Sequence, residues 1–306
     1  MMLHRVRAEG SDDSSPNRGL AISPAFLERF VRAAQHNGYT FVSLDHFIEQ
    51  LLVGSENKLL VLTFDDGYLD NFTEAYPLLK RMGIPFTIFV TTSFPDGEAV
   101  LWWYAIERLL LGNAPIILAN GHMLPARTNQ EKLDTFFFLR QLIMSLPRDG
   151  FGERVNALFK ETSFDWRQMC AAEALSWSDL CEMARDPLVT IGAHTVSHPV
   201  LSALTPERAC LEMRESRELL EARIGVNVTH LCYPFGGRGE VGVREFELAK
   251  KLGFKTATTT RWGNIFQKHR AHLHGLPRVH LTNTFNWDDF RRQSLRRFLR
   301  GRVVSE

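Results

Sequence analysis

The chain has 306 residues, of which 44% are hydrophobic and 23% are charged, so it can bury a sizeable core as two domains or as one α/β barrel. Its 36 basic and 35 acidic residues leave a formal net charge of +1, which excludes a global electrostatic reason to bind nucleic acid. The N-terminus lacks the pattern of a signal peptide, and no run approaches the ~18 apolar residues of a membrane span. We therefore expect a cytoplasmic protein, with the inner membrane face as an alternative, although strand character in residues 1–6 leaves open whether a preceding segment is missing.

The first hundred residues alternate between strand and helix patterns. Predicted helices begin at Pro24, after an N-capping Ser23, and at Asp45, which we expect to cap the second helix. Predicted strands are residues 40–44, 59–64 and 86–90, and a helical repeat of apolar residues over 72–82 follows the middle one. Such alternation predicts a parallel sheet.

Residues 95–187 break this alternation, because they contain helical patterns and hardly any strand signal. We predict a helical insertion, led by Trp102 and Trp103. These side chains either stack on sugar rings or anchor the insertion in its own core, and the sequence leaves both interpretations open.

Strand and helix patterns alternate again after the insertion. The predicted strands are residues 188–192, 229–233, 254–259 and 276–281, with helices over 205–225 and 243–252. About seven strands with intervening helices predict a single α/β domain that comprises residues 1–306. They favour a distorted (β/α) barrel of parallel strands rather than an open sheet. A basic amphipathic helix is predicted at residues 287–302; it either docks by its apolar residues, which we prefer, or lies on an anionic membrane surface.

The four cysteines argue against a cysteine-based metal site. They form no Cys-x-x-Cys pair and are spread over helical and strand-like segments: Cys170, Cys181, Cys210 and Cys232. We therefore expect reduced thiols, with neither a zinc knuckle nor a disulfide framework.

Two carboxylates directly follow the apolar run at residues 59–64. Side chains of adjacent strand residues point to opposite faces, so Asp65 and Asp66 serve one site only if the chain turns there, as Gly67 permits. Asp-Gly is also a hairpin signal, but the helical pattern that follows weakens that interpretation. Because adjacent carboxylates repel each other unless a cation or proton intervenes, a metal is the economical explanation.

His194 and His198 lie just after the predicted strand at 188–192. Two histidines four residues apart meet on one side of a helical turn or tight loop, so both can bind one cation. Because active sites of α/β barrels collect at the carboxyl ends of the strands, we expect the pair near Asp65 and Asp66. Two histidines and one aspartate leave room for water; zinc fits these ligand types best, and other first-row divalent metals stay open.

Two further loops carry weaker signals. Phe235 lies in a Pro-Phe-Gly-Gly loop after the strand at 229–233, where a backbone N–H has room to face a developing oxyanion. Arg278 and His280 bring a cation and a titratable group to the last predicted strand. Each loop alone is weak evidence for a site.

Together and in this order, these segments resemble the polysaccharide deacetylase family (carbohydrate esterase family 4, the NodB-homology domain). The matching motifs are residues 63–67, 194–199 and 233–236, and residues 3–6 resemble the start of members associated with exopolysaccharide or lipopolysaccharide. The resemblance implies a distorted (β/α) barrel and metal-dependent removal of acetyl groups from sugars. By position, it implies that Asp66, His194 and His198 hold the metal and that Asp65 is the general base.

Two departures from the family pattern affect the expected catalytic residues. Cys232 stands where many members have an arginine that orients the base, and we hypothesise that Arg278 substitutes for it. The family's late histidine, which protonates the leaving amine, has three candidates: His280, His274 and His272. The backbone N–H of Phe235 is the expected oxyanion donor.

The sequence thus predicts a hydrolase that removes N-acetyl groups from a polysaccharide, an oligosaccharide or a lipid-linked glycan. Two alternatives stay open: a carbohydrate-binding homologue without turnover, and a hydrolase of another amide on the same scaffold. A binding module has no need for a free base beside three metal ligands, which favours the enzyme. The expected partners are a divalent metal and an acetylated glycan, and no nucleic acid.

Overall fold

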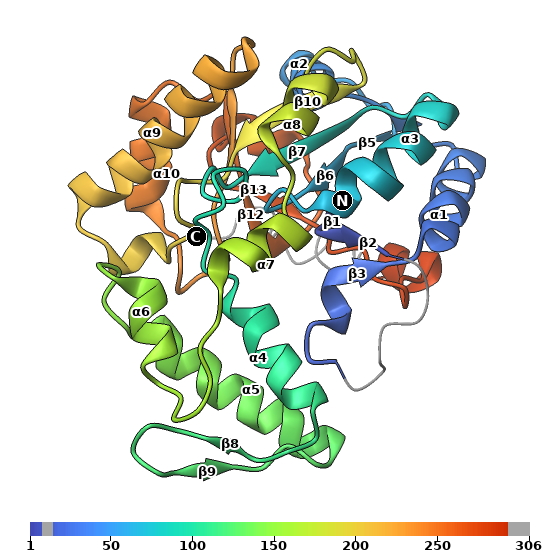
Figure 1. Cartoon of the computed structure of the whole chain (residues 1–306). Coiled ribbons are helices and arrows are strands. Elements are labelled where there is room, and N and C mark those ends of the chain that lie inside the picture. The colour runs from blue at the N-terminus through green and yellow to red at the C-terminus, as the bar shows by residue number, and fades with distance from the viewer. Residues whose placement is uncertain (8–14, 293–306) are drawn as a thin grey trace.

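Seven parallel strands form the centre of the molecule in the computed structural model, which describes residues 1–7 and 15–292 (Figure 1). In their order across the sheet they are β1 (Met2–Leu3), β6 (Leu62–Phe64), β7 (Phe86–Val90), β10 (Val189–Ala193), β11 (His230–Cys232), β12 (Thr256–Trp262) and β13 (Leu276–Arg278). Met2 donates to the carbonyl of Val279 (2.8 Å) and accepts from the N–H of Leu281 (2.9 Å), so the two outer strands approach each other. The predicted distorted (β/α) barrel is confirmed.

Helices cover the outside of the barrel because each presents one apolar face to it. They are α1 (Pro24–His36), α2 (Leu44–Val53), η2 (Asn71–Ala75), α3 (Tyr76–Met82), α8 (Trp177–Met183), α9 (Pro206–Ile224) and α10 (Val243–Lys251). In α1, for example, residues at helical spacing are fully buried, among them Leu27, Val31 and Ala34. Short turns η1 (Arg18–Leu20), η3 (Leu201–Ala203) and η4 (Gln267–Ala271) complete the connections.

Two pairs of short parallel strands flank the barrel: β2 (Arg5–Val6) with β3 (Ala21–Ile22), and β4 (Thr40–Phe41) with β5 (Leu59–Leu60). The strand predicted at residues 40–44 is therefore shorter than expected and lies outside the seven-stranded sheet. Ser43, not Asp45, caps α2, because its hydroxyl accepts the N–H of His46. Asp45 lies in the first turn and pairs with Lys255 at 2.7 Å.

The insertion after β7 has a hydrophobic core of its own and extends away from the barrel (lower part of Figure 1). Its elements are α4 (Trp102–Leu111), β8 (Ile116–Ile117), β9 (Met123–Leu124), α5 (Asn129–Met144), α6 (Phe151–Asn156) and α7 (Trp166–Glu173). The β8–β9 hairpin corrects the expectation of hardly any strand in the insertion. Each of its strands has only two residues, so the sequence shows little strand periodicity there. Trp102 and Trp103 are 4% and 8% exposed and pack in this core, so most of their surface anchors the insertion.

The predicted C-terminal helix is described only at its start, from Trp287 to Arg292. The Trp287 ring stacks on Phe30 of α1, with ring centroids 5.4 Å apart. The rest of the predicted basic helix, residues 293–302, lies outside the described residues. In the part of the chain that is described, no helix is both long and apolar enough to cross a membrane.

Candidate active site

Asp65 and Asp66 reach the same end of the barrel because the chain turns between them. Asp66 has φ +77° and Gly67 has φ +95°, a left-handed conformation that glycine adopts most readily. A Cβ on Gly67 would also lie 3.3 Å from a methyl group of Val90. The turn leaves Asp65 directed into the barrel, after the inward Thr63, and directs Asp66 towards the loop after β10.

His194 and His198 meet the carboxylate of Asp66 there. Oδ1 of Asp66 lies 3.2 Å from Nε2 of His194 and 3.3 Å from Nε2 of His198. The His194 ring is 2% exposed and its Nδ1 bonds to the carbonyl of Cys232 at 2.7 Å, so Nδ1 carries the proton and Nε2 is free to act as a ligand. One ligand atom from each of these three residues lies within 4.8 Å of the others.

The loop that holds both histidines is strained, and α9, the next α-helix along the chain, stabilises it. Thr195 and His198 have positive φ angles, +66° and +54°, which cost free energy in non-glycine residues. Glu212 of α9 accepts the backbone N–H groups of Val196 and Ser197, both at 2.9 Å, and the Ser197 hydroxyl at 2.6 Å. Sequence analysis missed Glu212, because only the folded chain brings it beside the loop.

Asp65 pairs with Arg278 instead of the histidines. Two guanidinium nitrogens of Arg278 donate to the two carboxylate oxygens, each at 2.7 Å, and the pair is almost fully buried. Burial by itself raises the pKa of Asp65, but the Arg278 guanidinium outweighs it and holds the pKa below its usual value. Arg278 therefore lies where it can orient Asp65, as the hypothesis that it replaces the family's usual arginine requires.

A second group, Asp65, His194 and Cys232, also lies close enough to hold an ion. Arg278 makes it a poor cation site, because its guanidinium is bonded to Asp65 and lies 3.0 Å from Sγ of Cys232. A divalent cation there would meet a fixed positive charge. Among the described residues, no guanidinium is hydrogen-bonded to Asp66, His194 or His198, so the group around Asp66 fits a divalent cation better.

Phe235 closes one side of the site. Its φ is +60°, and its ring centroid lies 4.8 Å from that of His198. Thr260 donates to its carbonyl, whereas its own backbone N–H has no acceptor among the described residues. That N–H remains available to a ligand.

Of the three candidate late histidines, His280 is the one that faces the site. His280 lines the cavity together with Asp65, Asp66 and the two loop histidines, and its buried Nε2 has no partner among the described residues. His274 instead bonds the carbonyl of Phe254 through Nε2 (2.8 Å), and His272 is exposed. Burial, and after it the neighbouring His4, lower the pKa of His280 to about 4.

His4 is a site residue that sequence analysis did not predict. Its ring centroid lies 5.7 Å from that of His280, it lines the same cavity, and its Nδ1 is buried without a partner among the described residues. The only signal was its place after a short strand, and that strand enters the barrel through pairing with β6, some 60 residues away.

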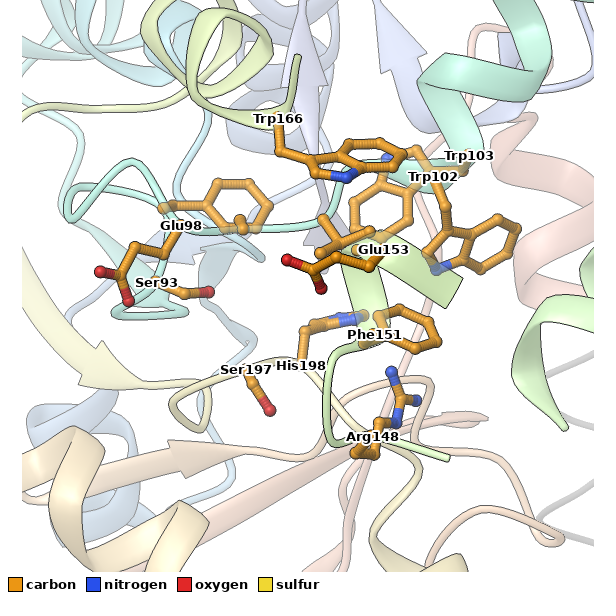
Figure 2. Close-up of a pocket in the computed structure, with 14 residues that line it drawn as sticks. Ser93, Glu98, Trp102, Trp103, Arg148, Phe151, Glu153, Trp166, Ser197 and His198 are labelled. Carbon is orange, nitrogen blue, oxygen red and sulfur yellow. The ribbon is translucent and has the colours of Figure 1, made fainter. Parts of the chain in front are cut away.

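Two adjoining cavities open at this end of the barrel. The first, which we call the catalytic cavity, has a volume of about 350 Å³ and contains the aspartates and histidines described above. The second, which we call the side cavity, has about 300 Å³ and lies under the insertion, lined by Arg148, Glu153 and Trp166 among others (Figure 2). Trp102, Trp103 and His198 line both cavities, so the edges of the two tryptophans are available to a ligand.

The fold and the site define a class of protein: a parallel (β/α) barrel with a carboxylate–histidine group at the carboxyl ends of its strands. Residues 53–257 match the sequence model of the polysaccharide deacetylase family, and this is more than half of the chain. The chain belongs to this family, whose members hydrolyse the amide bond of N-acetylated sugars. The predicted family and enzyme class are confirmed.

Individual relatives are distant. The Bacillus subtilis (strain 168) protein YxkH, itself assigned to the polysaccharide deacetylases, is 24% identical over 67% of this chain and 46% of its own length. The poly-β-1,6-N-acetyl-D-glucosamine N-deacetylase of Escherichia coli (strain K12) is 22% identical over 92% of this chain and 37% of its own. The chain therefore spans less than half the length of these curated relatives.

Solved structures show the same fold. The Streptococcus pyogenes deacetylase PplD, solved in complex with acetate, has a TM-score of 0.64 at 18% identity and covers 95% of both chains. A de-N-acetylase from Aggregatibacter actinomycetemcomitans has a TM-score of 0.60 at 17% identity, covering 95% of this chain and 97% of its own.

Proposed function

We propose that this protein is a metal-dependent hydrolase that removes N-acetyl groups from an acetylated sugar in a polysaccharide, an oligosaccharide or a lipid-linked glycan. One observation carries the proposal: two adjacent aspartates have different partners. Asp65 is bonded at two points to Arg278, while Asp66 faces His194 and His198. This division separates a base from a metal ligand, as amide hydrolysis with an activated water requires.

Asp66, His194 and His198 would hold the metal. A divalent cation held there would polarise the acetyl carbonyl as a Lewis acid and would make a water molecule more acidic. Zinc suits one carboxylate and two imidazoles, and other first-row divalent metals suit them as well. The hydrogen bond from Nδ1 of His194 to the Cys232 carbonyl keeps the ring in the orientation that presents Nε2.

Asp65 would take the proton from the attacking water. Arg278 keeps the carboxylate ionised at neutral pH and fixes its direction, because both oxygens are bonded to the guanidinium. The remaining lone pairs of the carboxylate are available to the water. Arg278 would thereby orient the base, the role that the resemblance assigns to an arginine at the position of Cys232.

Phe235 and His280 would complete the reaction. The backbone N–H of Phe235 would donate to the oxyanion as the carbonyl becomes tetrahedral. The leaving amine then needs a proton, and His280 lines the same cavity as Asp65. Because His280 is neutral at pH 7, it would first have to receive a proton, and the one that Asp65 removes from water is a source.

The relatives support the substrate class. The Escherichia coli relative is named for its action on poly-β-1,6-N-acetyl-D-glucosamine, which belongs to the class of acetylated sugars that we propose for this chain. A binding module without turnover would have no use for an arginine that keeps a second carboxylate ionised. A cytoplasmic location, the inner membrane face and a membrane contact through residues 287–302 stay predictions, which cell fractionation tests.

The test is acetate release from N-acetylglucosamine oligomers by metal-reconstituted protein. Asp65→Asn should bind metal as the wild type does and release acetate ~10²- to 10⁴-fold more slowly. Asp66→Asn should lose the metal, and the exposed Asp288→Asn should change neither quantity. Metal binding without acetate release from any acetylated sugar would reject the substrate class, and release from other amides instead would favour the second alternative.

A further inference from the structure

Arg140 of α5 brings a guanidinium into the catalytic cavity from the insertion. Its Cζ lies 5.7 Å from the centroid of Phe235, whose ring in turn lies 4.8 Å from that of His198. The side chain is half-buried and lines the cavity together with Asp66 and His280. Among the residues that the structure describes, no carboxylate lies within ion-pairing distance of Arg140.

The charges that line the catalytic cavity do not balance with Arg140 included. The two carboxylates there are already engaged, Asp65 by Arg278 and Asp66 by the histidine pair. Every other titratable group except Tyr68 is basic: His4, His194, His198, His280 and Arg140. With a divalent cation on Asp66, the cavity would carry an excess of positive charge, and the guanidinium of Arg140 is free to pair with an anionic group of a ligand.

The side cavity has the opposite character. Glu98 and Glu153 line it opposite Arg148, as Figure 2 shows, so its carboxylates outnumber its guanidiniums. An anionic ligand group would therefore be attracted to the catalytic cavity and not to the side cavity. The position of Arg140, one aromatic ring away from His198, limits how far that group can lie from the scissile amide.

We propose that Arg140 binds an anionic group, a carboxylate or a phosphate, carried by the acetylated sugar itself or by the next unit of the glycan. This inference rests on the proposed function and narrows its substrate class from acetylated sugars in general to acidic ones. Arginine suits the role because its planar fork bonds two oxygens of a carboxylate or phosphate at once. The insertion thereby acts as a specificity element, since α5 carries both Arg140 and the buried Phe136 that packs on Trp102.

Binding and turnover test the inference separately. Metal-reconstituted protein is titrated by calorimetry with three ligands: N-acetylglucosamine, N-acetylglucosamine 1-phosphate and N-acetylglucosaminuronic acid. The same sugars, with neutral N-acetylglucosamine oligomers, are then assayed for acetate release. Wild type, Arg140→Gln, Arg140→Lys and Arg127→Gln are compared; Arg127 is exposed on the same insertion and lines neither cavity.

We expect wild type to bind at least one acidic sugar about tenfold or more tightly than the neutral one. Arg140→Gln should remove that preference and raise KM for the acidic substrate ~10- to 100-fold, with kcat and neutral-substrate KM nearly unchanged. Arg140→Lys should keep part of the preference, and Arg127→Gln all of it. Preference for the phosphate alone identifies a phosphorylated or lipid-linked sugar, and preference for the carboxylate alone identifies a uronic acid.

The inference is overturned if wild type shows no preference for either acidic sugar, or if Arg140→Gln retains it. It is also overturned if Arg140→Gln weakens neutral and acidic ligands equally, because that indicates a structural role. If acidic sugars bind through Arg140 but no sugar releases acetate, the proposed function fails, while anion binding by Arg140 stands.

Discussion

Arg278 bonds both carboxylate oxygens of Asp65 across the barrel, at 2.7 Å each, although 213 residues separate the two in sequence. β13 and β6 are separated only by β1 around the barrel, and residues with inward side chains on the two strands share its interior. The Thr63 hydroxyl, one inward position below Asp65, accepts a further hydrogen bond from Arg278 at 2.9 Å. The base is thus oriented by the barrel itself.

Replacing Arg278 by glutamine should shift the pH dependence of catalysis. Burial, which raises the pKa of Asp65, would no longer be opposed by a cation. We expect the acid limb of kcat/KM to move to higher pH by a unit or more at saturating metal. Arg278→Lys should shift it less, because it keeps the charge; equal profiles for all three proteins would contradict the assignment.

The same ion pair predicts how stability depends on pH. The folded-state pKa of Asp65 is depressed, so the pair contributes stability above the unfolded-state pKa, about 3.9, and loses it as pH falls through the lower folded-state value. Breaking a buried pair by removing one partner costs about 3–5 kcal/mol. Denaturant unfolding of Arg278→Gln at pH 7 should show a loss of this order.

Glu212 should control metal affinity without touching the metal. Its carboxylate holds the strained histidine loop through Val196 and Ser197, so Glu212→Ala should weaken metal binding ~10- to 100-fold. Glu215→Ala, on the exposed side of the same helix, is the matched control. Competition with a chromogenic chelator measures both, and equal affinities would show that the loop keeps its shape unaided.

Metal removal should destabilise the folded protein as well as abolish its activity. A ligand present at 100 times its Kd stabilises the folded state by about 2.7 kcal/mol, so a chelator should lower Tm by several degrees. His194→Ala should show the low Tm with or without chelator, because it removes one ligand of the group. The exposed His46→Ala should respond to the chelator as wild type does.

His280 should be the histidine whose loss slows turnover with metal still bound. His280→Asn is expected to lower kcat ~10²-fold or more, while His272→Ala, at an exposed position, should leave kcat unchanged. Metal content must be measured for both proteins. A full rate for His280→Asn would direct attention to His4, which lines the same cavity.

Gly192 should tolerate no side chain. A Cβ there would lie 2.4 Å from the Phe89 ring, and both residues are on adjacent strands of the barrel. Gly192→Ala should lower the free energy of unfolding by about 1–3 kcal/mol, because the Phe89 ring or the neighbouring strands must move to make room for the methyl group. Gly239→Ala, where a Cβ meets nothing within 4 Å, is the control in thermal unfolding.

Local sequence determined much of this protein. The apolar runs before Asp65 and His194 predicted two barrel strands, and the acids and histidines after them predicted the candidate site, because parallel strands end at one edge. The helical insertion was also predictable from its periodicity. The β8–β9 hairpin and the true cap of α2 were missed, since two-residue strands and neighbouring capping residues carry little local signal.

Other features exist only in the folded chain. No local pattern could choose His280 over His274 or His272, because the choice depends on which ring faces the cavity. Asp65 is 213 residues from Arg278, and Arg140 reaches the Phe235 ring from the insertion, so neither contact can be read from local sequence. Glu212 is only 15 to 16 residues from the N–H groups it accepts, but the contact still depends on how α9 packs against the histidine loop. Sequence determines strands, turns and the chemical groups at their ends; barrel closure and docking of the insertion decide which groups meet, because those contacts are set by long-range packing.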